Sequence, residues 1–202
     1  MQKSVKPLHL VLLAIVLIVL IWSGITPKDR FTWFLEIAPV LIGFALIVPT
    51  YHRHRLTELL YVLITVHCVI LCIGGRYTYA EVPFGFWVQE MFGFSRNHYD
   101  RFGHFAQGFI PAILAREILI KNQVVKNKKW LFLIVTSICL SFSAIYEFIE
   151  WGAASVSGEG ATAFLGTQGD VWDTQWDMFL ALVGALTAQL TLANWHDRQL
   201  KQ

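Results

Sequence analysis

The chain has 202 residues, of which 55% are hydrophobic and only 15% charged, and its formal net charge is +2. A mean hydropathy of +0.53 excludes an ordinary soluble domain and is typical of a polytopic membrane protein. We therefore expect an all-α integral membrane protein, folded as a single domain over residues 1–202.

Hydropathy predicts about six membrane-spanning helices, each near the length that a helix needs to cross a bilayer. In chain order they cover residues 8–24, 31–50, 56–75, 102–119, 130–151 and 176–195. Lys3 and Lys6 precede the first range as they would in a signal peptide, but no small-residue cleavage site follows it. We expect this first helix to be retained.

The positive charges are unevenly divided between the two sides of the predicted bundle. Six crossings place both termini on one side, which carries ten Lys or Arg residues against five on the other. The positive-inside rule then predicts cytoplasmic termini in a bacterial inner membrane. The basic loops at residues 52–55 and 121–129 are interpreted as topology signals that contact membrane lipids, and no nucleic-acid partner is expected.

An aromatic segment connects the third predicted helix to the fourth. Residues 76–99 hold eight Tyr, Phe or Trp side chains, interleaved with Pro83, Gly85 and Gly93. A segment of this composition is expected to lie in the membrane interface or to fold over a site as a lid.

Three pairs of ionisable residues lie near the ends of the last three predicted helices. Within each pair the residues are three or four positions apart, so both project from one helix face. The fourth helix begins on the side where the fifth ends and the sixth begins, which places all three pairs in one leaflet, the outer one by the charge rule. Ionisable side chains within a bilayer carry a large free-energy cost, so their presence indicates a functional site. The pairs are Asp100 and His104, Glu147 and Glu150, and Asp173 and Asp177.

Further polar residues accompany these pairs. Gln107 continues the helix face of Asp100 and His104, and Arg101 is close in sequence. Gln168 and Asp170 end a glycine-rich loop before the last helix, where glycine allows either close approach to a ligand or a tight turn. We expect Arg101, Gln107, Gln168 and Asp170 to support the site.

The chain resembles the YjdF family of uncharacterised bacterial inner-membrane proteins over nearly its whole length, in GGRYTYAEVPFG, NHYDRFGHFAQGFIPA, SAIYEFIEW and FLGTQGDVWDTQWDM. Residues 99–190 are more loosely similar to the VanZ-like membrane proteins, known for a role in teicoplanin resistance. That group carries an aspartate before a histidine, an acidic residue with a glutamine, and an aspartate followed by asparagine and glycine.

The three polar pairs match these three elements in order. Glu150 stands where the VanZ-like pattern has glutamine, and Asp177 stands where it has asparagine, so this site is more acidic. The resemblance implies a shared architecture and a shared polar centre, and no named reaction.

Five carboxylates and one histidine brought together in a low dielectric would repel one another unless a cation joined them. Arg96 and Arg101 could supply salt bridges. A divalent metal would supply the charge better, and zinc, manganese or magnesium suits oxygen-rich ligands with one imidazole. The expected ligands are Asp100, His104, Glu147, Glu150, Asp173 and Asp177.

Three functions remain open on this pattern. A metal-dependent hydrolase would act on a lipid-linked or phosphorylated substrate through metal-bound water, with His104, Glu147 and Asp177 as its catalytic residues. A structural or lipid-binding protein would pair the polar groups among themselves, and a transporter would use them as a proton or cation relay. Asp100 could also simply cap the fourth helix, and Asp170 and Asp173 could cap the sixth.

Several familiar motifs are missing from the sequence. It has no GxSxG elbow, no HExxH pair and no phosphate-binding Walker loop. Serine hydrolases, ordinary zinc proteases and nucleotide-driven pumps are therefore not expected.

Overall fold

The computed structural model describes residues 4–157 and 167–201. The regular secondary structure of these residues is entirely helical, with no strand. The all-α class is confirmed. The helices, in chain order, are α1 (Pro7–Ile25), α2 (Arg30–Thr50), α3 (Glu58–Tyr77), α4 (Pro83–Phe92), α5 (Tyr99–Lys121), α6 (Lys128–Ser157) and α8 (Asp173–Leu200).

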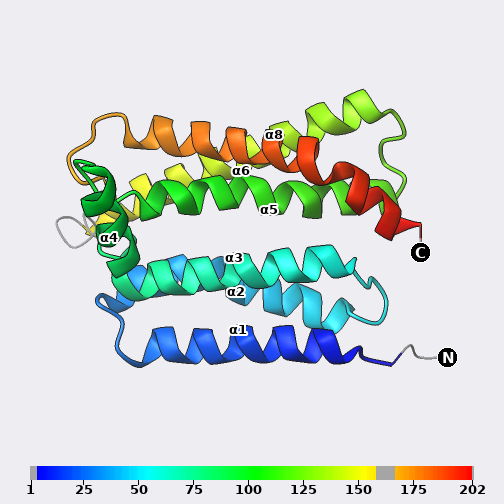
Figure 1. Cartoon of the computed structure of the whole chain (residues 1–202), viewed down its shortest axis with the longest axis horizontal. Helices are drawn as coiled ribbons and strands as arrows, with labels where there is room; N and C mark the ends of the chain where they lie inside the picture. The colour runs from blue at the N-terminus through cyan, green and yellow to red at the C-terminus, as the bar shows by residue number, and fades with distance from the viewer. Residues whose placement is uncertain (1–3, 158–166, 202) are drawn as a thin grey trace.

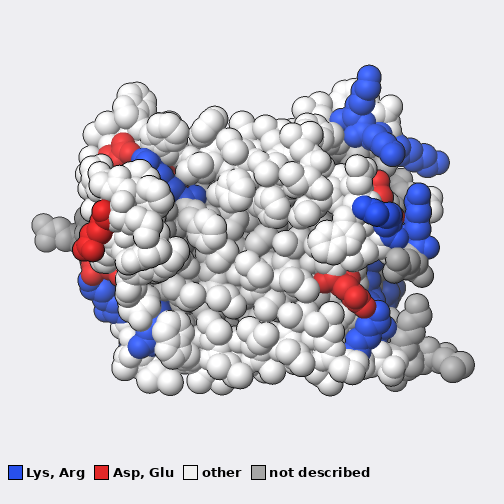
Figure 2. Space-filling view, viewed as in Figure 1, with Lys and Arg blue, Asp and Glu red and all other residues white. Residues whose placement is uncertain are grey.

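The six long helices run side by side along the long axis of the molecule, and consecutive long helices run in opposite directions (Figure 1). Both termini therefore lie at the same end of the bundle. On the face in Figure 2, Lys, Arg, Asp and Glu gather at the two ends and leave an uncharged band between them. This distribution fits a protein whose middle lies in hydrocarbon and whose ends lie at the two interfaces.

Each of the six predicted ranges falls on one of the long helices. Among the described residues, five helices are long and apolar enough to cross a membrane, namely α1, α2, α3, α6 and α8. Helix α5 is outside this set because polar residues dilute its first half. It is nevertheless 23 residues long and at 1.5 Å per residue extends about 34 Å beside α8, enough to cross the same layer.

The aromatic segment contains a short helix, α4, that sequence reasoning treated only as a loop. Pro83 occupies its first turn, where the missing N–H costs nothing. Gly93 ends it in the left-handed conformation, with φ of 67°. Phe84, Trp87 and Phe92 are exposed at the bundle end where α5 begins (Figure 1). Their position in the membrane interface stays a prediction.

Helices α5 and α8 touch through their backbones. A β-carbon at Gly108 of α5 would overlap the carbonyl oxygen of Ala181, and one at Gly184 of α8 would overlap the carbonyl oxygen of Phe105. Small residues at such a crossing let two helices approach closely. This contact holds the start of α8 in register with the start of α5, where their polar pairs lie.

Gly108→Ala should therefore destabilise the protein, by about 3 kcal/mol, because the added methyl group meets backbone that cannot move aside. Gly43→Ala is the matched control, since a β-carbon there meets nothing within 4 Å. It should be neutral or slightly stabilising, because alanine is the better helix former. Thermal unfolding in detergent measures both, and equal midpoints for the two variants would contradict the close α5–α8 contact.

Candidate functional site

The three polar pairs meet at the end of the bundle opposite the termini. Helices α5 and α8 contribute their first two turns and α6 contributes its last part. All six side chains are buried, with between 2% and 8% of each residue exposed. These residues are distant in sequence, and the structure brings them together at one end of the bundle. They are Asp100, His104, Glu147, Glu150, Asp173 and Asp177.

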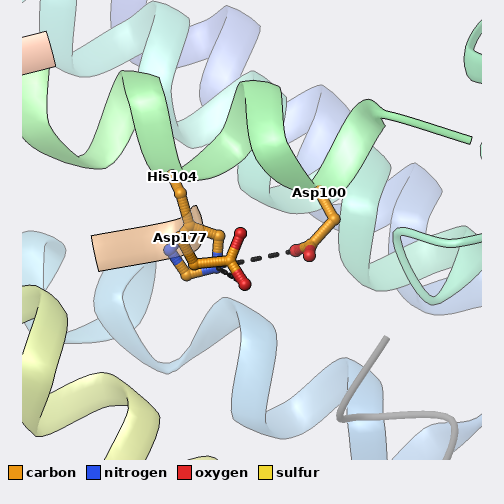
Figure 3. Close-up of side chains that lie close together, drawn as sticks. All are labelled: Asp100, His104 and Asp177. Atoms are coloured by element: carbon orange, nitrogen blue, oxygen red, sulfur yellow. Dashed lines mark ion pairs between the residues drawn. The ribbon is translucent and has the colours of Figure 1, made fainter. Parts of the chain in front are cut away.

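The imidazole of His104 lies at the centre of the group. Its Nε2 atom is 3.6 Å from Oδ1 of Asp100 and 4.0 Å from Oδ2 of Asp177 (Figure 3). Its other nitrogen, Nδ1, is 3.9 Å from Oε1 of Glu147. One ligand atom from each of Asp100, His104 and Asp177 can be chosen so that all three lie within 4.8 Å of one another.

Several polar atoms in this group lack a hydrogen bond. Among the described residues, Nδ1 of His104, Oε1 of Glu147 and Oδ1 of Asp177 are buried without a hydrogen-bond partner. An unmade bond of this kind costs about 1–3 kcal/mol per group. Orphaned polar atoms gathered around one imidazole are an arrangement that a bound cation would satisfy.

The nearby arginines neutralise other carboxylates. Arg96 is 2.5 Å from Oδ1 of Asp173 and 3.5 Å from Oδ2 of Asp170, and Arg101 is 2.5 Å from the same oxygen of Asp170. The predicted salt bridge is therefore present between Arg96 and Asp173, whereas Arg101 pairs with Asp170.

The loop before α8 is tied to the loop before α5. The backbone N–H of Asn97 donates to the Gln168 side chain at 3.0 Å, and the Gln168 amide donates back to the Asn97 carbonyl at 2.8 Å. The buried Asn97 side chain in turn donates to the carbonyl of Val82. Gln168 and Asp170 thus connect the loop before α8 to Asn97 and Arg101 at the start of α5, and their support of the site stays a prediction.

His98 belongs to the same connection. Its Nδ1 atom lies 3.4 Å from the Arg101 guanidinium. Burial, together with the positive charges of Arg101 and Arg96, lowers the pKa of His98 below its usual value. The neutral ring can therefore accept a hydrogen bond from Arg101.

Sequence reasoning missed one carboxylate of this region. Glu36 of α2 is 5% exposed and accepts a hydrogen bond of 2.9 Å from the hydroxyl of Tyr146. The Tyr146 ring in turn stands edge-on to that of His104, with centroids 6.2 Å apart. A lone glutamate within an apolar span is itself a signal of function, and it could have been noticed inside the predicted range 31–50.

A second buried polar network lies at the other end of the bundle. Glu117 is fully buried. It accepts hydrogen bonds from the backbone and hydroxyl of Thr57, at 2.9 and 2.7 Å, and lies 2.6 Å from Lys121 and 2.9 Å from His196. Lys121 lies one turn along the same helix, whereas His196 comes from α8. Since both oxygens of Glu117 are satisfied, this network is structural.

Comparisons with known proteins agree with this architecture. Residues 8–198 match the family described as "Predicted membrane protein (DUF2238)". The inner membrane protein YjdF of Escherichia coli (strain K12) is 51% identical over 203 residues, which cover 100% of this chain and 97% of that protein. No solved structure matches the chain.

The resemblance to the YjdF family is therefore confirmed, while the looser resemblance to VanZ-like proteins stays a prediction. Together with the five apolar helices, the similarity identifies a multi-pass inner-membrane protein. The chain belongs to the DUF2238 family of membrane proteins.

Proposed function

We propose that the chain binds a divalent metal ion at the bundle end opposite the termini and uses it to hydrolyse a lipid-linked, phosphorylated substrate. The observation that carries this proposal is the convergence of two buried carboxylates, Asp100 and Asp177, on the same nitrogen of His104. A purely structural network would be expected to give each of these groups a hydrogen-bond partner, as Glu117 has.

The spacing of the three side chains suits one metal ion. Ligand atoms 2.0–2.2 Å from a metal lie no more than about 4.4 Å from each other. The separations of 3.6 and 4.0 Å from Nε2 of His104 fall within that limit, and one ligand atom from each of the three residues lies within 4.8 Å of the other two, so a small side-chain adjustment would complete the site. One imidazole and two carboxylates fit zinc, manganese or magnesium and leave coordination positions for water and substrate.

The surrounding residues would prepare this centre. Glu147 faces Nδ1 of His104, where a carboxylate fixes the orientation of a ligating imidazole. A metal bound there would activate water as the nucleophile. Glu147 or the buried Glu150 would accept the proton. Asp173 is already paired with Arg96. Of the six predicted ligands, it is therefore the one whose loss should affect metal binding least.

The position of the centre favours a substrate carried by a lipid. His104 lies in the second turn of α5, about 8 Å from its start, and so within reach of the interface. The exposed aromatic residues of α4 lie at the same end. By the positive-inside rule this end faces away from the cytoplasm and both termini are cytoplasmic.

Transport receives less support from the fold. The backbone contact at Gly108 and Gly184 lies between this site and the Glu117 network. Below it, α5 and α8 pack through fully buried apolar residues, including Ala112, Ile113 and Ala185. The buried polar residues farther along the bundle include Ser143 of α6 and Gln189 of α8, which donates a hydrogen bond to Thr136. These side chains carry no charge, so they support a proton or cation path less than ionisable residues would.

Phosphate release from purified protein tests the proposed activity. A panel of phosphatidic acid, polyprenyl phosphate and polyprenyl diphosphate in mixed micelles is incubated with wild type, Asp177→Asn and Asp173→Asn, with added metal or with chelator. We expect metal-dependent release by wild type and Asp173→Asn, and none by Asp177→Asn. Equal release by wild type and Asp177→Asn, or no release from any substrate, would contradict the proposal.

A further inference from the structure

A small apolar cavity lies among helices α1, α2 and α3, in the half of the bundle near the termini (Figure 1). Its volume is about 100 Å³, and side chains such as Leu13, Val40 and Ile64 line it. An apolar cavity of about 150 Å³ binds a benzene molecule. The cavity among α1, α2 and α3 is therefore large enough for a short stretch of hydrocarbon.

The cavity reaches the surface of the bundle between α1 and α2. Of its lining residues, Val48 is exposed, and Leu12, Gly43 and Ile47 are half-buried. Both helices are long and apolar enough to cross a membrane, so the surface around this opening faces the acyl chains of the bilayer. A β-carbon at Gly43 would meet nothing within 4 Å, which leaves room for a chain that enters from the bilayer.

A polar atom without a partner belongs to the otherwise apolar lining. The ring of His9, in the first turn of α1, lines the cavity, and its Nε2 atom is buried without a hydrogen-bond partner among the described residues. Other polar groups of the lining are satisfied. Thr65 donates to the carbonyl of Tyr61 at 2.9 Å, and the Tyr61 hydroxyl accepts from the backbone N–H of Leu56 at 3.3 Å. A ligand in the cavity could supply the bond that Nε2 of His9 lacks.

The contacts of His9 indicate which of its two nitrogens carries the hydrogen. The Tyr51 hydroxyl lies 2.7 Å from Nδ1 of His9, and it accepts a hydrogen bond of 3.5 Å from the backbone N–H of Lys6. Because that oxygen is the acceptor for Lys6, its own hydrogen is left to donate to Nδ1. A neutral imidazole that accepts at Nδ1 carries its hydrogen on Nε2. The cavity therefore offers a donor, and a matching ligand must bring an acceptor.

The depth of His9 in the membrane matches the ester groups of a glycerolipid. Helix α1 has 19 residues and is about 28 Å long, close to the roughly 30 Å thickness of the hydrocarbon layer. Its first turn therefore lies at the boundary between hydrocarbon and head groups. The ester carbonyls of glycerolipids lie at this boundary, and each is an acceptor attached directly to a hydrocarbon chain.

We propose that this cavity holds part of one acyl chain of an ester-linked glycerolipid, whose ester carbonyl accepts a hydrogen bond from Nε2 of His9. Ligand sites commonly combine an apolar lining with a few polar groups that fix the orientation of the ligand. The head group stays outside the cavity, so the site selects the ester linkage and not the charge of the head group. The site is separate from the metal centre and does not depend on the proposed hydrolysis.

Native mass spectrometry of the detergent-solubilised chain tests the hydrogen bond by titration with dioleoyl phosphatidylcholine and with its ether-linked analogue. The two lipids share head group and chains, but the ether lacks the carbonyl. Wild type should bind the ester lipid about tenfold more tightly, because leaving a buried donor without an acceptor weakens binding by about this factor. His9→Phe keeps a ring on Tyr61 without a donor, so it should bind both lipids equally. The matched control is His54→Phe, at an exposed histidine outside the lining, which should keep the tenfold preference.

The cavity itself is tested by Gly43→Leu, which fills it from α2. This variant should bind the ester lipid at least fivefold more weakly and keep the thermal midpoint of wild type. Ala45→Leu, at an exposed position of α2 outside the lining, should change binding less than twofold. Oleic acid should bind more weakly than the ester lipid, because its carboxylate would lose hydration at the cavity.

Equal affinity of wild type for the ester and the ether lipid would overturn the proposal. A tenfold ester preference that persists in His9→Phe, or equal binding by Gly43→Leu and Ala45→Leu, would also overturn it. Tighter binding of oleic acid than of the ester lipid would assign the cavity to a free fatty acid instead.

Discussion

Asp177→Asn should abolish the stabilisation of the protein by divalent metal while leaving the metal-free protein at least as stable as wild type. In the absence of metal, Asp177 is a buried carboxylate close to Asp100, His104 and Glu147, and removing its charge relieves repulsion. With metal at 100 times its dissociation constant, wild type should gain about 2.7 kcal/mol. Thermal unfolding in detergent, with chelator and with zinc, manganese or magnesium, measures both effects.

The matched control for this experiment is Asp173→Asn, one turn earlier on α8. Asp173 is paired with Arg96, so its variant should lose stability with and without metal but keep the metal-dependent gain. A structural role for the cluster predicts the opposite result for Asp177, namely a loss of stability in chelator. That outcome, or an unchanged metal response in Asp177→Asn, would remove Asp177 from the proposed ligand set.

Glu117→Ala should have the largest effect on stability of any single change at the end of the bundle where the termini lie, a loss of about 3–5 kcal/mol. The substitution leaves His196 and Thr57 without their acceptor in a fully buried place. Chemical unfolding followed by tryptophan fluorescence, or the thermal midpoint, gives the difference from wild type.

Glu58→Ala is the control for Glu117→Ala. Glu58 is an exposed carboxylate near the same end and pairs with Lys6. Surface ion pairs contribute little, so this variant should unfold almost as wild type does. Comparable losses for Glu58→Ala and Glu117→Ala would show that burial of Glu117 does not determine the stability of this end.

The helices were predictable because hydropathy reports the bilayer directly. Even α5, whose polar residues weaken the signal, falls on its predicted range, since Phe102 to Leu119 still forms an apolar run with a polar stripe. Helix α4 was missed because its ten residues are too few for periodicity to distinguish a helix from an aromatic loop. Its end signals, Pro83 and Gly93, were present in the sequence.

The site was predictable only to the level of which residues meet. The spacing of the residues along each helix and the alternating direction of successive helices predict that Asp100, His104 and Asp177 lie at one end of the bundle. Neither pattern indicates which carboxylate faces which nitrogen of His104. The pairing of Arg96 with Asp173 joins residues 77 positions apart, and a single sequence carries no sign of it. Glu36 is not part of a spaced pair of ionisable residues, so a search for such pairs passed over it, although a glutamate inside an apolar span is itself a signal.

The most direct test of the metal centre is the metal content of the purified protein, measured by inductively coupled plasma mass spectrometry. Wild type is compared with a variant carrying both Glu147→Ala and Asp177→Ala, after both are dialysed against the same trace-metal buffer. We expect close to one zinc, manganese or magnesium ion per chain in wild type and almost none in the variant. Equal metal content in the two proteins, or no metal in wild type even after loading, would contradict it.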